Sequence, residues 1–375
     1  MAYNALQFGL IGLLGGVASG VFAGLGLALP WWAWSLAAVL LVGVLGYRQV
    51  DLSAKVLVVL VVLEYLIVFV VDFAILKAGG ASGLSVNLFD PSALFSGSLT
   101  AAVLFCLGSF MGFEATTIYA EEARDPDKTI PRATFLSVLL IGAFFVFTTW
   151  LMIAGVGANE LIPSLKALSD PTSFFFELAG RYVGGPVPTI AGVLLVSSLF
   201  AAVSAFHNYI ARYSYVAGRE GLLPAACGRT HGVFESPHIG SVIQTVGALG
   251  VIAVFAGLGL DPVLNLFTWI SQVGVLGVLG LMAITSMAVV VFFRREGGGS
   301  TMRTLVLPIV SGLVMAALFV YVFMHFGDLT GTQGGLLGVL LPSMIPVAGI
   351  VGWMIAARLR AGRPAAFASM GASRV

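Results

Sequence analysis

Charged side chains are scarce in this sequence. Lysine, arginine, aspartate and glutamate together make up 9% of the 375 residues, whereas hydrophobic residues make up 59%. A soluble domain carries about 25% charged residues, so this chain cannot cover itself with a surface that faces water. Its net charge of +1 gives no basic field, so nucleic acid is not expected as a partner. The composition therefore excludes a soluble globular protein and predicts that a lipid bilayer surrounds the chain.

The residue types that build metal sites and many active sites are also few. The two cysteines, Cys106 and Cys227, have neither the pattern of a disulfide framework nor that of a metal site. The four histidines, His207, His231, His238 and His325, are scattered along the chain and form no cluster. A membrane-embedded enzyme would need a cluster of histidines or acids, a Cys/His pair or a phosphate-binding motif within the bilayer. We therefore expect no enzyme activity, no metal and no cofactor.

Long apolar runs make up most of the chain. About 20 apolar residues are needed to cross the ~30 Å hydrocarbon core of a bilayer, and ten runs approach or exceed this length. They predict an all-α membrane protein that forms a single domain over residues 1–375. The second run is short and the eighth is long, so we expect a tilt or a break there. The ten predicted spans are 5–25, 31–47, 55–77, 97–120, 133–156, 187–213, 239–258, 264–292, 305–326 and 336–358.

The basic residues predict how the chain is oriented. Cytoplasmic loops of membrane proteins retain lysine and arginine. With the amino terminus inside, 15 of the 18 basic residues fall in cytoplasmic segments, and the other three are Lys77, Lys166 and Arg181. We therefore expect a plasma-membrane protein with both termini in the cytoplasm, including a tail over 359–375.

The segment 157–186 is expected outside the cell. Asp170-Pro171-Thr172 predicts a turn, and the residues from Ser173 to Glu177 predict a short amphipathic helix on the outer surface. Such a helix fits a lid over a substrate path, and it fits an ordinary interfacial loop as well.

Glycines recur at helical spacing in two spans. A stripe without side chains lets a second helix approach closely, so both stripes predict helix packing. They are Gly12, Gly16, Gly20 and Gly24 in the first span and Gly274, Gly277 and Gly280 in the eighth.

Two acids, Glu64 and Glu114, lie well within predicted spans. A charged group inside the bilayer is costly, so each is a candidate for function. Burial in a medium of low dielectric constant disfavours the charged form of a carboxyl, and such a group can exchange a proton during transport. The alternative is an acid that stays protonated and bonds to a neighbouring helix. Asp72 lies nearer the outer end of its span and is expected at the interface.

Two glycines interrupt the middle of the fourth span. Gly108 and Gly112 flank Ser109, and together they lower helix propensity. An unwound turn would free backbone groups, which the bilayer tolerates only where they line a polar cavity or bind a ligand. Broken helices in many transporters point their ends at the substrate. An intact helix with two packing glycines is the alternative.

Three motifs along the chain carry a resemblance to a known family. The first motif has three parts, Phe110-x-Gly112-Phe113-Glu114, Glu121-Glu122-Ala123-Arg124-x-Pro126 and Thr129-Ile130-Pro131-Arg132-Ala133. The second has Ala211-Arg212, Tyr215 and Gly218-Arg219-Glu220-Gly221-Leu222-Leu223-Pro224. The third is Leu52-Ser53-Ala54-Lys55. They resemble, in turn, the sixth helix and its following loop, the inner end of the eighth helix, and the entry to the fifth helix of permeases in the amino acid–polyamine–organocation (APC) superfamily. That family usually has Asp where Glu220 stands.

The resemblance covers nearly the whole chain and implies a fold. The ten spans correspond to helices three to twelve of an inverted-repeat, leucine-transporter-like permease fold. Members of the family are similar in having twelve helices, of which the first is broken and binds the carboxylate of the substrate. Nothing of that kind precedes Tyr3, so we expect a chain that lacks the first two helices of the family pattern.

The resemblance also implies a function, namely secondary active transport of amino acids or related amines, with protons as the coupling ion. The break would be the surviving half of the site, with Phe110 or Phe113 as an aromatic gate and Glu114 as the group that responds to protonation. Glu64 stands where many relatives have a lysine, so their coupling scheme does not carry over to it. The substrate-binding residues implied are Gly108, Ser109, Phe110, Met111, Gly112 and Phe113. From this resemblance and the glycine pair we predict that the fourth span is unwound near Gly108 to Gly112.

The sixth span adds a polar stripe. Ser197, Ala201, Ser204 and Asn208 share one helical face, which would line the substrate cavity or form hydrogen bonds between helices. His207, one position away, is expected to be structural.

The loop from Glu121 to Arg132 is predicted to be cytoplasmic. Asp125-Pro126 is expected to end one helix, and Pro131 suits the first turn of the next.

Two other functions stay open. A channel would need a continuous polar or charged ring through several helices, and the sequence offers two isolated acids. An inactive remnant of a permease would keep the fold without the transport. Neither the particular amino acid, nor symport against antiport, nor an oligomeric state follows from the sequence.

Overall fold

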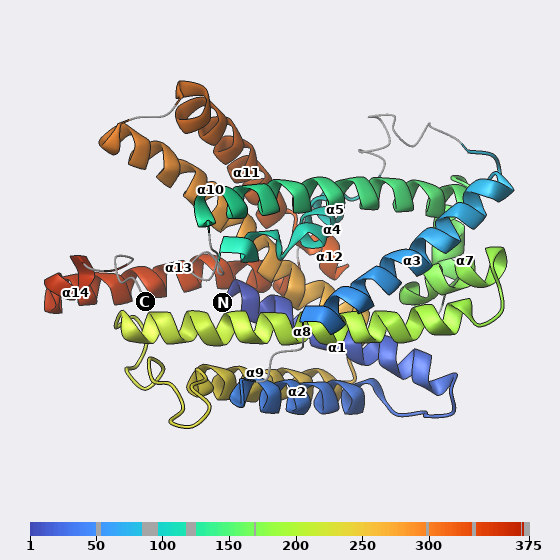
Figure 1. The fold of residues 1–375 in the computed structure, drawn as a ribbon, viewed down its shortest axis with the longest axis horizontal. Helices are drawn as coiled ribbons and strands as arrows, with labels where there is room; N and C mark the ends of the chain where they lie inside the picture. Colours follow the sequence, from blue (N-terminus) through green and yellow to red (C-terminus); the bar gives the residue numbers. More distant parts are fainter. Residues whose placement is uncertain are drawn as a thin grey trace.

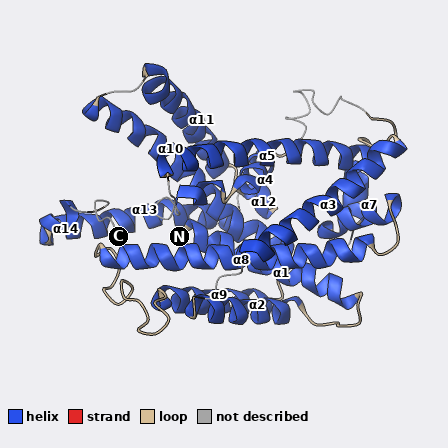
Figure 2. Ribbon diagram, viewed as in Figure 1, coloured by secondary structure: helices blue, strands red, loops and turns tan. Residues whose placement is uncertain are grey.

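The computed structural model describes residues 1–49, 54–84, 97–117, 125–168, 170–297, 300–331, 335–368 and 370. All regular structure within these ranges is helical (Figure 2). In the same ranges, nine helical segments are long and apolar enough to cross a membrane, and a tenth apolar helix is shorter. Each predicted span corresponds to one helix or to two in succession. The predicted all-α membrane architecture is therefore confirmed.

Most of the helices have regular α geometry. Among the described residues, four segments do not: η3 and η5 are 3-10 helices, and η6 and η7 are π-helices. The elements are α1 (Ala2–Ala23), α2 (Trp31–Tyr47), α3 (Ala54–Ala78), α4 (Leu99–Phe110), η3 (Phe113–Thr117), α5 (Pro126–Val156), α6 (Leu161–Ala167), η5 (Pro171–Ser173), α7 (Phe174–Tyr182), α8 (Val187–Arg219), α9 (His238–Gly257), η6 (Pro262–Ser271), α10 (Gln272–Glu296), η7 (Met302–Val306), α11 (Leu307–Met324), α12 (Gly327–Thr330), α13 (Leu336–Gly362) and α14 (Pro364–Ala368).

Helices α1, α2, α8 and α9 pack together into what we call the four-helix body (Figure 1). A cluster of buried aliphatic side chains from all four helices fills its centre. A chain of side-chain amides crosses the same body: Asn4 donates to Gln244, Gln244 donates to Gln7, and Gln7 Nε2 donates to the carbonyl of Val203 at 3.0 Å. Gln7 and Gln244 are each 1% exposed, so these bonds are shielded from solvent. The aliphatic cluster comprises Ile11, Leu14, Val17, Ala38, Val39, Val42, Leu199, Val203, Ala248 and Ile252.

A second core surrounds the amino-terminal half of α10. Leu104 of α4, Phe206 of α8 and Phe326 beside α12 pack against buried residues between Val273 and Leu279. Helix α11 then runs back along α10, and the two form the hairpin at the upper left of Figure 1. This core fixes the position of α4, and so of the break that follows it.

The predicted glycine stripes are confirmed in part. A Cβ atom at Gly12 would lie 2.7 Å from Leu266, and one at Gly16 would lie 2.9 Å from Val263. The absence of a side chain at both glycines therefore allows η6 to pack closely on α1. Gly274 likewise approaches Leu6 of α1. The expectation for Gly20 and Gly24 was wrong, because no other helix among the described residues comes within 4 Å of a Cβ atom at either position. Within this stripe, close packing ends at Gly16.

Helices α3, α5 and α7 meet at one end of the molecule, and we call this contact the outer junction. Tyr182 Oη donates to the carbonyl of Gly155 at 2.7 Å, and the amide of Ala81 donates to the carbonyl of Ala154 at 2.8 Å. The turn and short helix predicted after Asp170 are confirmed as η5 and α7, and the Asp170 carboxylate accepts from the amide of Thr172 at 2.9 Å. Helix α6 was not foreseen.

Two expectations about helix ends are decided by the structure. Helix α5 begins at Pro126, so Asp125-Pro126 starts this helix, and the expectation that Pro131 occupies its first turn was wrong. Pro126 at the first position suits a helix start because its missing N–H would have no partner there. The predicted break near the eighth span is confirmed as the change from η6 to α10 at Ser271. Glu121 to Arg124 of the predicted loop lie outside the described residues.

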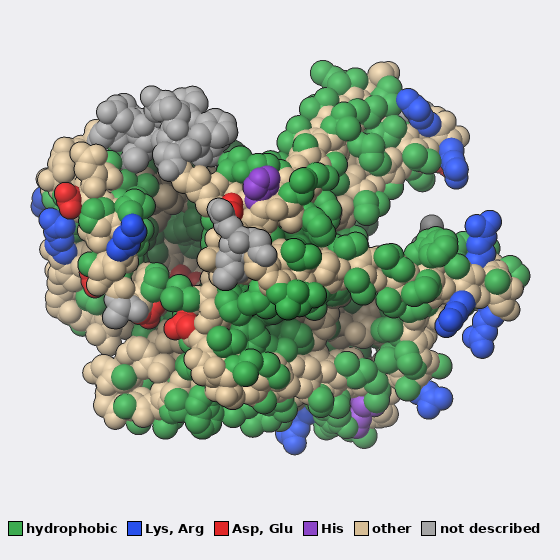
Figure 3. Space-filling model, turned by 180° about the vertical axis from the view of Figure 1, so that it is seen from behind, with side chains coloured by type: hydrophobic (Ala, Val, Ile, Leu, Met, Phe, Trp, Pro, Cys, Tyr) green, Lys and Arg blue, Asp and Glu red, His purple; other side chains and the backbone are tan. Residues whose placement is uncertain are grey.

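The surface of the molecule is largely apolar. Figure 3 shows hydrophobic side chains over much of one face, with most of the visible lysine and arginine toward the two ends of the long axis. Large side chains such as Phe135 (79% exposed) project outward from α5. A surface of this kind is stable against lipid acyl chains and unstable against water.

Candidate functional site

The fourth span is broken at its middle. Helix α4 ends at Phe110, and its last backbone hydrogen bond runs from the amide of Met111 to the carbonyl of Gly108 at 3.1 Å. Gly112 then adopts a φ of +108°, a conformation that L-residues with a side chain rarely adopt. The 3-10 helix η3 follows from Phe113. The predicted unwinding near Gly108 to Gly112 is therefore confirmed.

The carboxylate of Glu114 lies across this break. Its Oε2 accepts a hydrogen bond from the backbone amide of Gly112 at 2.9 Å, and its Oε1 accepts one from Tyr3 Oη at 2.6 Å. The first bond satisfies an amide that the broken helix leaves without a carbonyl partner. Glu114 therefore holds the shape of the break and joins it to the first turn of α1.

Aromatic rings surround Tyr3 on the side of α8. Its ring lies edge-on to Phe206 at 5.2 Å between centroids, and Tyr213 and Tyr209 follow at 5.9 and 6.2 Å. Tyr3 was not predicted as a site residue, because it lies 111 residues from Glu114 and nothing local connects the two. The signal in the sequence was a hydroxyl group near the start of a largely apolar helix.

Helix α5 supports the other side of the break. The hydroxyl groups of Thr116 in η3 and Thr134 in α5 lie 2.8 Å apart and share a hydrogen bond. Thr117 Oγ1 donates to the carbonyl of Glu114 at 2.7 Å. The first bond fixes η3 against α5 and the second lies within η3, so a shift of α5 would act on Glu114.

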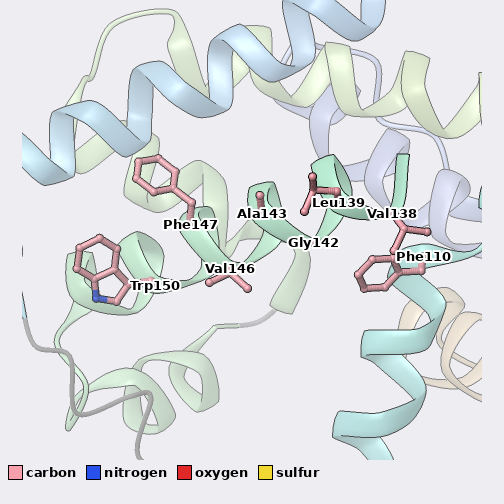
Figure 4. A pocket seen from close by; sticks show the side chains of 8 residues that line it. All are labelled: Phe110, Val138, Leu139, Gly142, Ala143, Val146, Phe147 and Trp150. Atoms are coloured by element: carbon pink, nitrogen blue, oxygen red, sulfur yellow. The ribbon is translucent and has the colours of Figure 1, made fainter. Parts of the chain in front are cut away.

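A pocket of about 610 Å³ adjoins the break and runs along α5. Figure 4 shows Phe110 at one end of a row of side chains from α5, with Trp150 at the other. Gly142 leaves room for Phe110, whose ring would lie 3.6 Å from a Cβ atom placed there. The lining carries no charged group, so this pocket suits hydrocarbon and not an ammonium group. Its lining residues are Phe110, Val138, Leu139, Gly142, Ala143, Val146, Phe147 and Trp150.

The remaining residues of the predicted half-site have different surroundings. Ser109 is exposed, and its hydroxyl donates to the carbonyl of Phe105 at 2.9 Å. Met111 packs against the core around α10. Phe113 is half-buried in the first turn of η3. The six residues from Gly108 to Phe113 thus share one break without converging on one cavity.

Glu64 occupies a separate place. Its Oε2 accepts a hydrogen bond from Ser198 of α8 at 2.8 Å, which joins α3 to the four-helix body. Its hydrogen bond goes to α8, whereas those of Glu114 go to Gly112 and to Tyr3 of α1. The structure therefore gives the two candidate acids different partners.

The polar stripe on α8 makes local bonds. Ser197 Oγ donates to the carbonyl of Leu194 at 2.7 Å, and Ser204 Oγ donates to that of Phe200 at 2.8 Å. Ala201 between them is half-buried. Ser198, one residue from the predicted stripe, makes the contact between helices. Hydroxyl groups bonded to the preceding turn remain able to accept from a ligand.

Two further polar groups are buried. The expectation that Asp72 reaches the interface was wrong: it is 0% exposed and accepts from Thr148 Oγ1 at 2.8 Å. His207 is 2% exposed and shares a hydrogen bond of 2.7 Å with Ser241 of α9, in line with a structural role. Over the described part of the chain, no group of three or more His, Cys, Asp or Glu residues could hold a metal ion.

In the described ranges, the structure has nine apolar helices of membrane length and a shorter tenth, and one of the nine is broken with a carboxylate across the break. These features define a multi-pass membrane protein with the architecture of a ten-helix permease. Residues 7–361 match the model of the amino acid permease family, and the chain belongs to this family. The predicted resemblance to APC permeases is thereby confirmed.

Several characterised relatives are similar over part of their length. The chain is 27% identical over 307 residues to the low-affinity putrescine importer PlaP of Escherichia coli K12. The aligned region covers 78% of this chain and 64% of that protein. It is 24% identical over 273 residues to the gamma-aminobutyric acid permease of the same organism, covering 71% and 57%. It is 22% identical over 204 residues to the branched-chain amino acid permease BcaP of Bacillus subtilis, covering 54% and 40%. The chain spans less than two thirds of the length of these relatives.

Proposed function

We propose that this protein carries amino acids or related amines across the cytoplasmic membrane as a secondary active transporter, without enzyme activity of its own. Membership of the permease family supports this proposal. The relatives named as a putrescine importer and a gamma-aminobutyric acid permease suggest a small molecule with a protonated amine. The observation that carries the proposal is the broken span, because free backbone groups at membrane depth are tolerated only in a polar cavity or at a ligand.

The break offers complementary groups for such a molecule. Backbone donors and acceptors between Gly108 and Gly112 would bind its polar end, and Phe110 or Phe113 would cover its apolar part. The carboxylate of Glu114 favours a cationic amine nearby.

Glu114 would also couple the proton to the substrate. A neutral carboxyl accepts the N–H bond from Gly112 less strongly than a carboxylate does, since bonds to charged groups are roughly twice as strong. Proton binding would therefore loosen the break, and proton release would tighten it. Glu64, bonded to Ser198, would be a second proton-binding acid that acts through α3 and α8. Ser197, Ala201 and Ser204 would form part of the wall that the substrate passes.

The proposed orientation has both termini in the cytoplasm and the whole chain as one transporter domain. In Figure 1 the amino terminus and the carboxyl-terminal ends of α8, α10 and α13 lie toward the left, and α7 lies at the right. Arginines in the last turns of these helices, among them Arg219, Arg294 and Arg360, support the proposal that this end faces the cytoplasm. The segment 157–186, with α6 and α7, would then be an outer lid, and 359–375 an inner tail.

An inactive remnant is the second candidate, and the exposure of Ser109 beside the break favours it. A transporter at work would shield such a site from lipid. In that case the chain would fold and insert without moving a substrate.

Uptake into proteoliposomes tests the proposal. The purified chain would be reconstituted with an inward proton gradient and offered labelled putrescine, gamma-aminobutyric acid and leucine. We expect uptake of at least one compound, and loss of that uptake when a protonophore is added. Glu114→Gln should lose most of it, whereas Glu177→Gln, the same change at an exposed position of α7, should not. A folded protein that takes up none of a full panel of amino acids and amines would favour the remnant.

A further inference from the structure

Asp72 is an acid that the proposed transport cycle does not use. It lies in α3 within the outer junction and is 0% exposed. Its Oδ2 accepts one hydrogen bond, from Thr148 Oγ1 of α5 at 2.8 Å. Its Oδ1 is buried and has no hydrogen-bond partner among the described residues.

Within the part of the chain that the structure describes, no basic side chain pairs with Asp72. The cluster around it consists of Val71, Ile75, Leu151 and Ala179, with further apolar side chains from α5, α7 and α8. Within α5 the charged residues Asp127, Lys128 and Arg132 all lie in its first two turns, far from Thr148.

The titratable groups on the neighbouring elements are engaged elsewhere or exposed. On α7, Tyr182 donates to the carbonyl of Gly155, while Glu177 and Arg181 are exposed. On α3 itself, Lys77 is exposed and Glu64 bonds to Ser198. On α8, His207 bonds to Ser241 of α9, and Arg212 and Arg219 lie near its opposite, carboxyl-terminal end.

A carboxylate in this position would be unfavourable. Burial away from water disfavours the charged form, and a single donor leaves one anionic oxygen without compensation. A protonated Asp72 fits the same geometry, because at 2.8 Å either oxygen of the Asp72–Thr148 pair can be the donor. Thr148 would then direct its own hydrogen to a carbonyl of the preceding turn, as threonines in helices do.

Helix α5 links this pair to the break. Thr148 contacts Asp72, and Thr134 of the same helix shares a hydrogen bond with Thr116 of η3. The two threonines are separated by roughly 21 Å along an α-helix. A change in how α3 packs on α5 would therefore act on η3 through one continuous element.

We propose that Asp72 is a proton-binding residue of this protein, and that its proton keeps α3 packed on α5 at the outer junction. Loss of the proton would leave a charge in an apolar contact and favour an opened junction that water can enter. The part of the proposal that concerns transport rests on the proposed function, whereas the proton site itself does not.

Infrared spectroscopy of the full chain in liposomes tests the proton site directly. A protonated carboxyl gives a C=O stretching band that a carboxylate does not. At neutral pH we expect the wild type to show one more protonated carboxyl than Asp72→Asn, and this signal should disappear as pH is raised. Glu64→Gln and Glu114→Gln should both retain it. Equal bands in the wild type and Asp72→Asn would overturn the proposal.

Thr148 supplies a second measurement that does not depend on the folding of the first variant. Thr148→Val removes the hydroxyl group at constant shape, so the Asp72 band should move to the position of a carboxyl without a hydrogen bond. Thr149→Val makes the same change at the adjacent exposed residue and should leave the band in place. A band that Thr148→Val does not move would contradict the assigned pair.

The coupling to transport is read separately. If the chain takes up substrate, Asp72→Asn should flatten the pH profile of uptake, because an amide mimics the protonated acid at every pH. If Asp72→Asn loses the infrared band but keeps the wild-type pH profile of uptake, Asp72 binds a proton without affecting transport. That result would overturn the coupling and support the proton site. If no compound is transported, the transport function fails and the infrared result alone decides about Asp72.

Discussion

The phenolic hydroxyl of Tyr3 donates a hydrogen bond to the carboxylate of Glu114, which lies 111 residues further along the chain. This bond ties the first turn of α1 to the broken span. It stands beside a second bond, from the amide of Gly112, so both oxygens of Glu114 are occupied. The break is therefore held from two sides by one carboxylate.

Tyr3→Phe should loosen the break without disturbing the aromatic cluster around residue 3. The ring that packs on Phe206 is kept, and only the hydroxyl group is lost. A hydrogen bond to a charged group contributes about 1.5–3 kcal/mol, and half-burial of Glu114 places the expected loss toward the lower figure. Thermal unfolding in detergent measures it. Tyr65→Phe, at an exposed tyrosine of α3, is the matched control, and an equal effect of both variants would refute the role of Tyr3.

Gly112→Ala should destabilise the protein through the backbone alone. The space around Gly112 is open, with nothing within 4 Å of a Cβ atom, but its φ is +108°. A side chain in such a conformation costs of order 1–3 kcal/mol. Gly250 in α9 has equally open space and helical geometry, so Gly250→Ala should be neutral or stabilising by up to ~1 kcal/mol. Denaturation of both variants would show the contrast, and similar stability would mean that Gly112 is not strained.

Gln244→Leu should be more damaging alone than together with Gln7→Leu. The single change leaves the buried amide of Gln7 without its donor, and an unsatisfied buried polar group costs about 1–3 kcal/mol. Replacing both partners removes this penalty, so the double variant should lose less than the sum of the two single variants. A double-mutant cycle of unfolding measures the coupling. Strict additivity would show that the amide chain does not act as a unit.

Cysteine labelling should place the two ends of the long axis on opposite sides of the membrane. In a background with Cys106→Ser and Cys227→Ser, a membrane-impermeant reagent should label Lys166→Cys in intact cells. Asp127→Cys should react only after the cells are opened. Labelling of Asp127→Cys from outside would reverse the proposed orientation.

The sequence predicted the broken span because its cause is local. Gly108 and Gly112 flank the unwound turn, and the positive φ falls on Gly112, so composition and geometry meet at the same residues. The apolar spans were predictable for the same reason, since the length of an apolar run sets whether it can cross a bilayer.

Contacts between distant segments were not predictable in this way. Asp72 was expected at the interface because it lies toward the end of an apolar run, yet α7 packs over that end of α3 and buries it. Tyr3 was missed because its partner is on another helix. The first turn of α5 was predicted at Pro131 and is found at Pro126. Either proline, taken alone, is compatible with a first helical turn.

The amides that join α1 to α9 have a practical consequence for measuring motion. Side-chain amides stay uncharged over the whole working range of pH, so the bonds among Asn4, Gln7 and Gln244 should persist where carboxyl groups change their charge. Spin labels on α2 and α9 would therefore serve as a fixed reference frame. Labels on η3 and on α5 near Thr148 would report how far these elements move relative to that frame. Distances between the two sets of labels, measured at two pH values, would then show whether η3 and α5 move within the protein.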